Sequence, residues 1–315
     1  MRIITKRADS YTAFSRRDIT GKSLHCILVS KTRMSDTDSL QYLPMERWGE
    51  LEEAFKADWP RGISGYTALR TQRDLASRGL GYGFKVYCPF GDVSSGMVAL
   101  NKKDTLNEII IHSPRLDTTQ LEKALVSTKV IDWSTPILVP CLPPHTHECV
   151  KKVAQKLNLN FEGDDEHTPH DLVLYDVHKP AFDVRLPDDV TFQLLTEDLV
   201  DAIDAVWPNR YDSSKWVFKL LIKNKTGYGL FKNKELLAWV FINEIGALVH
   251  LYTHDDHRNK GYGKTVMKLL CNKSLEEKKP VFGYCMRENV SAEKLYESLG
   301  FEKFYHVNWT MLTPK

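Results

Sequence analysis

The chain has 315 residues, of which 42% are hydrophobic and 10% aromatic, so it can form a sizeable packed core. Its length favours about two domains. The formal net charge is only +2, which argues against a surface built to bind nucleic acid. No run of about 18 apolar residues is present, so the sequence predicts no membrane-spanning helix. The six cysteines contain no CxxC pair, which is typical of a reduced, intracellular protein.

Residues 1–33 form a basic extension with eight Lys or Arg residues against two Asp. The segment is also rich in hydroxyl side chains, and this composition is typical of a mitochondrial presequence. A disordered tail and an upstream extension ahead of a start at Met34 are the alternatives. We therefore expect an intracellular protein that is either mitochondrial or cytoplasmic.

From Leu40 to residue 177 the sequence predicts helices and strands in succession. Apolar residues at helical spacing predict the helices, and aromatic and β-branched runs beside Pro or Gly predict the strands. In chain order the expected elements are helix 43–59, helix 67–80, strand 84–88, strand 108–113, strand 136–142, helix 148–159 and strand 171–177.

Residues 178–189 contain two prolines and several charges, which predicts a linker. After it the expected elements are strand 190–195, helix 197–207, helix 213–224, strands 228–231, 236–243 and 247–253, helix 260–279, strand 281–286, helix 291–300 and strand 306–312. This order predicts an α/β fold with a mixed sheet.

The segment RNKGYG (258–263) lies between a predicted hydrophobic strand and a predicted long helix. Such a connection directs several free backbone N–H groups at one point, where the helix N-terminus adds positive potential. Gly261 and Gly263 lack side chains, so the backbone can approach an anion closely. Three basic side chains add charge: Arg258, Lys260 and Lys264. The segment therefore predicts a diphosphate site, and a glycine turn with a solvated basic face is the alternative.

Two other glycine patterns are weaker. RGLGYG (78–83) follows a predicted helix and precedes a predicted strand, so we expect Gly79 or Gly81 to end that helix as a C-cap. Residues 263–265 read GKT, the end of a nucleotide-binding P-loop, but Arg258 stands where that loop needs its first glycine. A nucleoside triphosphate site is therefore not expected.

The carboxyl-terminal half resembles the GNAT superfamily of acyl-CoA-dependent N-acyltransferases. The matching run is ALVHLYTHDDHRNKGYGKTVMKLLC (247–271), followed by ENVSAEKLYESLGFEKF (288–304). A more diffuse similarity over residues 40–315 points to the glycine N-acyltransferase-like branch, whose members carry a degenerate amino-terminal half. The resemblance implies a GNAT fold in the carboxyl-terminal half and a degenerate GNAT-like fold before it.

The resemblance also implies a site and its ligands. The co-substrate would be acyl-CoA or acetyl-CoA, with no metal, and the acceptor a small-molecule amine or amino acid. Tyr296 matches the family's acid near the thioester sulfur, and a phenol can donate a proton without being ionised at neutral pH. A helix tyrosine packed on the sheet is the alternative. The implied coenzyme A-binding residues are Leu251, Tyr252, Thr253, Arg258, Asn259, Lys260, Gly261, Tyr262, Gly263, Lys264 and Asn289.

The general base departs from the family pattern. Many relatives place a glutamate four residues before the first pantetheine-pairing position, and here that residue is Ala247. His250 should face the opposite side of the strand from Ala247 unless a bulge intervenes, because side chains alternate. Glu244 lies in the turn before the strand. The resemblance therefore names no base, and a small amine could also lose its proton through water.

Two further groups of residues have alternative interpretations. CLPPHTHEC (141–149) offers possible zinc ligands, but its spacing fits no common zinc pattern and a polar loop is favoured. Three tryptophans could line an acyl pocket, although core positions are commoner: Trp207, Trp216 and Trp239.

The sequence therefore predicts an acyl-CoA-dependent N-acyltransferase acting on a primary amine, such as glycine or another small amino acid. Residues 188–315 would form the acyl-CoA-binding domain, and residues 34–185 a degenerate companion that shapes the acceptor side. The main alternative is a non-catalytic acyl-CoA-binding protein that has lost turnover, which Ala247 favours. A phosphoryl-transfer enzyme using GKT is a weaker one.

Overall fold

The computed structural model describes residues 37–163, 170–176 and 178–315. The predictions for residues 1–33 lie outside this described part of the chain. Asp38–Lys315 form one compact unit. Within the described residues, no helix is long and apolar enough to cross a membrane.

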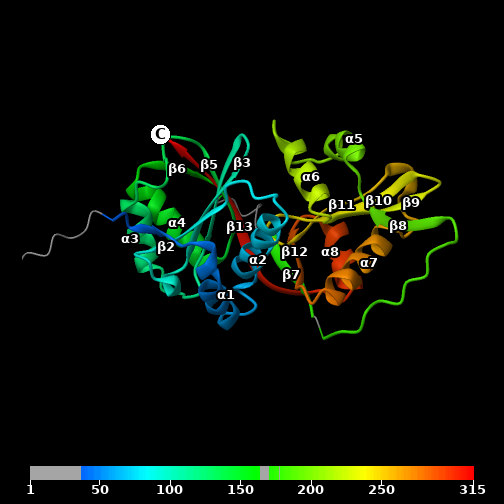
Figure 1. Ribbon diagram of the computed structural model, residues 1–315, viewed down its shortest axis with the longest axis horizontal. Helices are drawn as coiled ribbons and strands as arrows, with labels where there is room; N and C mark the ends of the chain where they lie inside the picture. Colours follow the sequence, from blue (N-terminus) through cyan, green and yellow to red (C-terminus); the bar gives the residue numbers. More distant parts are fainter. Residues whose placement is uncertain (1–36, 164–169, 177) are drawn as a thin grey trace, which may run out of the picture. The chain divides into compact units, whose positions relative to one another are not determined.

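The amino-terminal half, residues 38–163, carries four helices and six strands among its described residues (Figure 1). The helices are α1 (Trp48–Ala57), α2 (Ile63–Ser77), α3 (Thr119–Ser127) and α4 (Pro144–Lys156). The strands are β1 (Leu40–Tyr42), β2 (Lys85–Pro89), β3 (Met97–Lys103), β4 (Leu106–His112), β5 (Ile137–Leu142) and β6 (Leu159–Glu162).

The carboxyl-terminal half, residues 170–315, continues the succession of strands and helices. Its strands are β7 (His170–Tyr175), β8 (Val190–Leu194), β9 (Gly227–Lys232), β10 (Glu235–Ile242), β11 (Leu248–Thr253), β12 (Val281–Met286) and β13 (Glu302–Pro314). Its helices are α5 (Val200–Ala205), α6 (Ser214–Lys223), α7 (Tyr262–Glu276) and α8 (Val290–Ser298).

All of these strands join one mixed sheet, in the order β1-β2-β3-β4-β5-β13-β7-β12-β11-β10-β9-β8, with β6 also paired to β13. The pairs β4–β5 and β11–β12 are parallel, and the remaining pairs are antiparallel. The predicted α/β fold with a mixed sheet is therefore confirmed.

The two halves are joined at the middle of the sheet by β13. β7 pairs along its whole length with β12, whereas β13 pairs first with β7 and then with β5 and β6. In Figure 1 the end of β13, drawn in red, accordingly lies beside β5 and β6. Strand β13 of the carboxyl-terminal half thus also completes the sheet of the amino-terminal half. The domain boundary near residues 185–188 stays a prediction.

Helix α7 is held to the sheet by one apolar stripe. Val266, Met267, Leu270 and Cys271 recur at helical spacing and are fully buried in the core shared with β9, β10 and β12. Burying a side chain of this size contributes roughly 1.5–3 kcal/mol relative to leaving it exposed. The stripe therefore fixes the start of α7 close to the end of β11.

Some elements differ from their predicted bounds. Helix α4 begins at Pro144, four residues before the predicted start at 148, because a proline is well tolerated in the first turn. It ends at Lys156, and Leu159 already belongs to β6. Strand β13 extends beyond the predicted 306–312 at both ends. Four elements of the amino-terminal half had not been predicted: β1, β3, α3 and β6.

Candidate active site

A β-bulge interrupts β11 next to the predicted site. Trp239 pairs with Tyr252, but Phe241 pairs with Val249, so β11 has one residue more than β10 between these pairs. His250 lies in this bulge with φ 52°, in the left-handed region that histidine tolerates better than most residues.

The bulge turns His250 to the face occupied by α5 and α6. Its ring centroid lies 5.1 Å from that of Phe218 on α6 and 6.0 Å from that of Trp207. Val249 packs against the same aromatic core. The bulge is the exception that the sequence analysis allowed for at His250, because the extra residue breaks the alternation of side chains. Trp239 is buried in this core as well, as expected of a structural tryptophan.

The sheet opens between β11 and β12. The two strands pair only at Leu248 with Gly283, so the parallel ladder ends there. Beyond that pair, Tyr252 and Thr253 pair with β10 on their other edge. The predicted pantetheine-pairing residues Leu251, Tyr252 and Thr253 thus expose a backbone edge toward the opening. An extended chain can pair with such an edge as a strand would.

The RNKGYG loop sits at the end of β11 and starts α7 at Tyr262. Gly261 is the N-cap residue with φ 82°, and Asn259 is also left-handed with φ 62°. The backbone N–H groups of residues 259–264 have no acceptor in the part of the chain that the structure describes. Free N–H donors in succession at a helix N-terminus are suited to binding an anion.

Two basic side chains of this loop contact residues that precede it. The Arg258 guanidinium lies 2.7 Å from the Asp255 carboxylate, and it also packs over the ring of Tyr252. The Lys260 ammonium donates to the backbone carbonyl of Asp256 at 2.9 Å. Gly263 leaves no room for a side chain, because a Cβ there would lie 2.9 Å from Thr253 Oγ1.

Tyr296, on α8, places its hydroxyl where β11 and β12 separate. A Cβ at Gly283 would lie 3.0 Å from Tyr296 Oη and 3.3 Å from the carbonyl oxygen of Leu248. The ring packs edge-on against Phe301 at 5.0 Å. Burial raises the pKa of the Tyr296 hydroxyl above its usual range, so it stays protonated at neutral pH. A glycine inside a strand is a sequence signal for such a close approach, and Gly283 carries it.

Asn289 has a defined structural role. Its side chain is the N-cap of α8 and accepts a hydrogen bond from the Ala292 N–H at 3.0 Å. Such a cap typically stabilises a helix by about 1 kcal/mol. Its predicted contact with coenzyme A stays a prediction.

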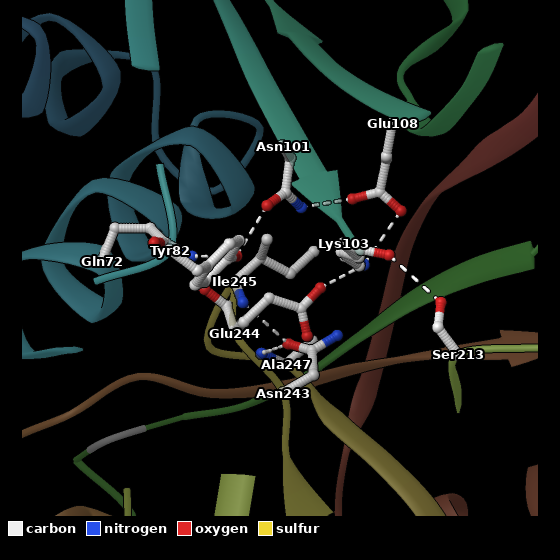
Figure 2. Close-up of polar contacts among 10 residues, drawn as sticks. All are labelled: Gln72, Tyr82, Asn101, Lys103, Glu108, Ser213, Asn243, Glu244, Ile245 and Ala247. Atoms are coloured by element: carbon white, nitrogen blue, oxygen red, sulfur yellow. Dashed lines mark hydrogen bonds and ion pairs between the residues drawn. The ribbon is translucent and has the colours of Figure 1, made fainter. Parts of the chain in front are cut away.

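Glu244 belongs to a buried ion cluster (Figure 2). The Lys103 ammonium contacts the Glu244 carboxylate and lies 3.0 Å from Glu108 Oε2. Burial lowers the pKa of Lys103, but the two carboxylates outweigh it and hold that pKa well above its usual range. Burial also raises the pKa of Glu108. Glu244 thus neutralises a buried lysine.

A hydrogen-bond chain extends this cluster into the amino-terminal half, as Figure 2 shows. The Asn101 amide donates to Glu108, and the Tyr82 hydroxyl donates to Asn101 Oδ1 at 2.6 Å. The Gln72 amide donates to the Tyr82 hydroxyl and to the backbone carbonyl of Glu244. The network fixes the turn that precedes β11, and no local sequence pattern predicted it.

The second glycine pattern is a helix end. Gly79 has φ 71°, its N–H bonds to the Ala76 carbonyl, and the Leu80 N–H bonds to the Leu75 carbonyl at 2.9 Å. This pair of bonds is a Schellman motif, which confirms Gly79 as the C-cap glycine of α2.

The cysteine and histidine residues of 141–149 point to separate partners. The Cys141 thiol shares a hydrogen bond with Tyr284, and His145 Nε2 lies 3.1 Å from the Ser113 carbonyl. The Cys149 thiol is directed at the Thr118 carbonyl. The described residues contain no group of three His, Cys, Asp or Glu placed to hold a metal ion.

Comparisons with known proteins agree on the fold. Residues 227–310 match the family model described as FR47-like protein. No curated protein matches the chain. A Drosophila protein is similar in structure, with 18% identity, a TM-score of 0.77, and coverage of 88% of this chain and 99% of that one.

Two further structures carry GNAT names. A tandem GNAT protein from the clavulanic acid biosynthesis pathway has 11% identity and a TM-score of 0.51, covering 86% of this chain and 97% of its own. A GCN5-related N-acetyltransferase from Sphaerobacter thermophilus has 9% identity and a TM-score of 0.50, covering 86% of this chain and 94% of its own. The chain thus has a GNAT N-acetyltransferase fold with two GNAT-like halves. The glycine N-acyltransferase-like subtype stays a prediction.

Proposed function

We propose that the protein is an acyl-CoA-dependent N-acyltransferase, which moves an acyl group from a coenzyme A thioester to a primary amine. The observation that carries the proposal is the opening between β11 and β12. The anion-binding loop before α7 lies at one end of this opening, and the Tyr296 hydroxyl lies at the other. The GNAT fold supports the same class of reaction.

The loop before α7 is proposed to bind the coenzyme A diphosphate. The N–H groups of residues 259–264 would donate to its oxygens, and the helix macrodipole would add about 0.3–1 kcal/mol for an anion at this position. The cations of Arg258, Lys260 and Lys264 would neutralise the remaining charge. Tyr262 and Gly263 are the first residues of α7, and their backbone would approach the diphosphate closely.

The exposed edge of β11 is proposed to pair with the pantetheine arm through Leu251, Tyr252 and Thr253. The thioester would then lie beside Leu248 and Gly283, where the Tyr296 hydroxyl can donate a proton to the leaving thiolate. Asn289 lies at the start of the same helix, and its contact with the arm rests on the resemblance alone.

The acceptor is proposed to be a small primary amine, such as glycine or another small amino acid. This choice rests on the resemblance to the glycine N-acyltransferase-like branch. The amino-terminal half, predicted as residues 34–185, would shape the acceptor side. Its contacts through Gln72 and Lys103 with the turn before β11 support that role.

A thiol-release assay tests the function. The full chain is incubated with a panel of acyl-CoAs, each with and without glycine, other amino acids and simple amines. We expect free thiol to form only when both an acyl-CoA and an accepted amine are present. Absence of thiol release together with absence of coenzyme A binding would contradict the proposal.

Thermal melting separates this proposal from the two alternatives. Coenzyme A at about 100 times its dissociation constant stabilises a protein by roughly 2.7 kcal/mol. We expect coenzyme A to raise the melting temperature and ATP with magnesium to leave it unchanged. Stabilisation by ATP with magnesium alone would favour phosphoryl transfer. Stabilisation by coenzyme A without thiol release would favour the non-catalytic binder, for which Ala247 is the motivating residue.

A further inference from the structure

The His250 ring is held in one tautomer by the backbone of α5. Its Nε2 atom lies 3.2 Å from the carbonyl oxygen of Ile203. A carbonyl oxygen can only accept a hydrogen bond, so Nε2 must carry the proton. The other ring nitrogen, Nδ1, is then an acceptor, and no described residue provides it with a donor. A neutral imidazole with an accepting nitrogen is a base in position to act.

The bulge places this base and the Tyr296 hydroxyl on opposite faces of β11. Tyr296 packs with Leu248 and Leu251 in the core under α7 and α8. The His250 ring contacts the aromatic core under α5 and α6. Along the strand, His250 lies two residues beyond Leu248, beside which the Tyr296 hydroxyl lies. The opening between β11 and β12 begins between these two positions.

We propose that His250 is the general base of the acyl transfer, in place of the glutamate that Ala247 lacks. This inference rests on the proposed function. An acyl-CoA bound on the α7 and α8 face would present its thioester at the opening. The amine would approach from the α5 and α6 face, where the His250 ring lies.

The proposed step balances without another reagent. The amine lone pair attacks the thioester carbonyl carbon, and the new C–N bond makes the attacking nitrogen acidic. His250 Nδ1 takes the proton that this nitrogen loses. The C–S bond then breaks, and the departing sulfur receives the Tyr296 hydroxyl proton. Water returns a proton to Tyr296 and removes one from His250.

The surroundings of His250 give its imidazole a pKa similar to that of a carboxylate base. Burial lowers the pKa of His250 to about 4, close to that of an ordinary glutamate. The rings of Trp207, Phe218, Trp239 and Phe241 around it carry no charge. Asp204, on α5, is the charged group that acts on the imidazole, and it is itself engaged by Ser214 and Arg210.

The test compares His250→Asn with the wild type. Asparagine tolerates the left-handed backbone of this position but has no basic nitrogen. A positioned base typically contributes about 10²- to 10⁴-fold in rate, so we expect kcat to fall at least 100-fold. Coenzyme A affinity should stay unchanged. His178→Gln, at an exposed histidine in the β7–β8 connection, is the control and should keep its turnover.

Chemical rescue separates a base from a packing role. His250→Gly also suits the positive φ and leaves room for a ring-sized molecule. Added imidazole should restore part of its turnover, whereas pyrazole, of the same size but far less basic, should not. Equal rescue by both molecules, or full turnover in a folded His250→Asn variant, would overturn the base assignment alone. Absence of thiol release in the wild type would overturn the proposed function and this inference together.

Discussion

The two hairpins β3–β4 and β10–β11 lead into matching parallel pairs, yet they offer different chemistry. In each half the parallel ladder consists of a single register pair, Glu108 with Leu138 in β4–β5 and Leu248 with Gly283 in β11–β12. The strand order around each pair is the same. Strands β4 and β5 nevertheless lie side by side over much of their length, whereas β11 and β12 touch at few positions, so the opening is a feature of the carboxyl-terminal half.

The helix that follows the first strand of each parallel pair starts differently. Helix α3 follows the segment SPRLDT (113–118), which has no glycine. There the Asp117 carboxylate accepts hydrogen bonds from the Thr119 N–H at 2.9 Å and from the Thr119 hydroxyl at 2.6 Å. The Asp117 carboxylate thus already binds an N–H group at the start of α3. No side chain caps the start of α7, so its first N–H groups remain without acceptors.

The strands around the two parallel pairs differ as well. The β3–β4 register runs unbroken, so no residue is turned as His250 is turned in β11. Leu138 of β5 occupies the position that corresponds to Gly283 of β12. Gly283 has no side chain and so leaves space for the Tyr296 hydroxyl, whereas Leu138 has a side chain at its own position. On α4, Val150 follows its N-cap residue at the interval that separates Tyr296 from Asn289. A bulge, a glycine, a tyrosine and an open helix start therefore distinguish the carboxyl-terminal half.

The largest expected effect comes from removing the Tyr296 hydroxyl from α8. Helix α4 has no hydroxyl at the corresponding position, Val150. Tyr296→Phe removes only the oxygen, and a positioned acid typically contributes about 10²- to 10⁴-fold in rate. We expect kcat to fall by at least 100-fold with coenzyme A affinity unchanged, measured by thiol release and by equilibrium binding. Tyr175→Phe, in the same apolar core, is the control and should change turnover little. Unchanged turnover in Tyr296→Phe would remove this residue from the mechanism.

Acid should destabilise both halves through one buried histidine in each. Burial lowers the pKa of His112 to about 3 and that of His250 to about 4, from 6.5. Their stabilisation is therefore present above pH 6.5 and is lost as pH falls through these lowered values. At about 1.4 kcal/mol per pKa unit, His112 contributes on the order of 5 kcal/mol and His250 on the order of 3 kcal/mol.

Denaturant titrations at several pH values between about 4 and 7 measure this loss. We expect His112→Leu and His250→Asn each to flatten the dependence of the unfolding free energy on pH. His178→Gln, at an exposed position, should leave the dependence as it is in the wild type. A slope that survives both buried substitutions would mean that other groups cause the acid lability.

A carboxylate introduced at the start of α7 should act there as Asp117 does at the start of α3. Gly263→Glu places a carboxylate among the open N–H groups, where it competes with and repels a diphosphate. We expect coenzyme A to bind roughly 30-fold more weakly, about 2 kcal/mol. Gly263→Ala separates charge from bulk, because its Cβ meets the same Thr253 hydroxyl at 2.9 Å. Isothermal titration of both variants measures the difference, and equal affinities would place the diphosphate elsewhere.

The parts of this site that the sequence predicted are local in the chain. The loop before α7 was predictable because the strand, the glycines and the helix stripe follow one another directly. The bulge at His250 was not, because it depends on the register between β10 and β11. The ion cluster of Lys103, Glu108 and Glu244 joins segments far apart in sequence, so no motif announces it.

Fold elements follow the same division. Strand β13 exceeds its predicted bounds because its two parts pair with β7 and with β5 and β6, which the local pattern does not reveal. Strand β3 (MVALNKK) had not been predicted because its apolar and polar residues do not alternate. Its first residues are buried on both faces of the sheet, so all of them are apolar. Helices with a regular apolar stripe, such as α7, were predicted within a few residues.

The smallest expected effect comes from Gly283→Ala, which gives β12 a side chain where β5 has Leu138. The new methyl group would lie 3.0 Å from Tyr296 Oη and 3.3 Å from the Leu248 carbonyl oxygen, so the tyrosine must move. Overpacking of this kind costs about 1 kcal/mol. We expect the unfolding free energy to fall by that amount and turnover to fall several-fold, measured by denaturant titration and thiol release.

A double-mutant cycle identifies the tyrosine as the cause. In Gly283→Ala combined with Tyr296→Phe the closest atom is absent, so the stability lost through Gly283→Ala should be largely recovered relative to Tyr296→Phe alone. Gly49→Ala is the matched control, because a Cβ there meets nothing within 4 Å and an alanine favours the helix α1. If Gly283→Ala lowers stability equally with and without the hydroxyl, then the Leu248 carbonyl limits the space. The glycine would then serve the strand pair rather than the position of the acid.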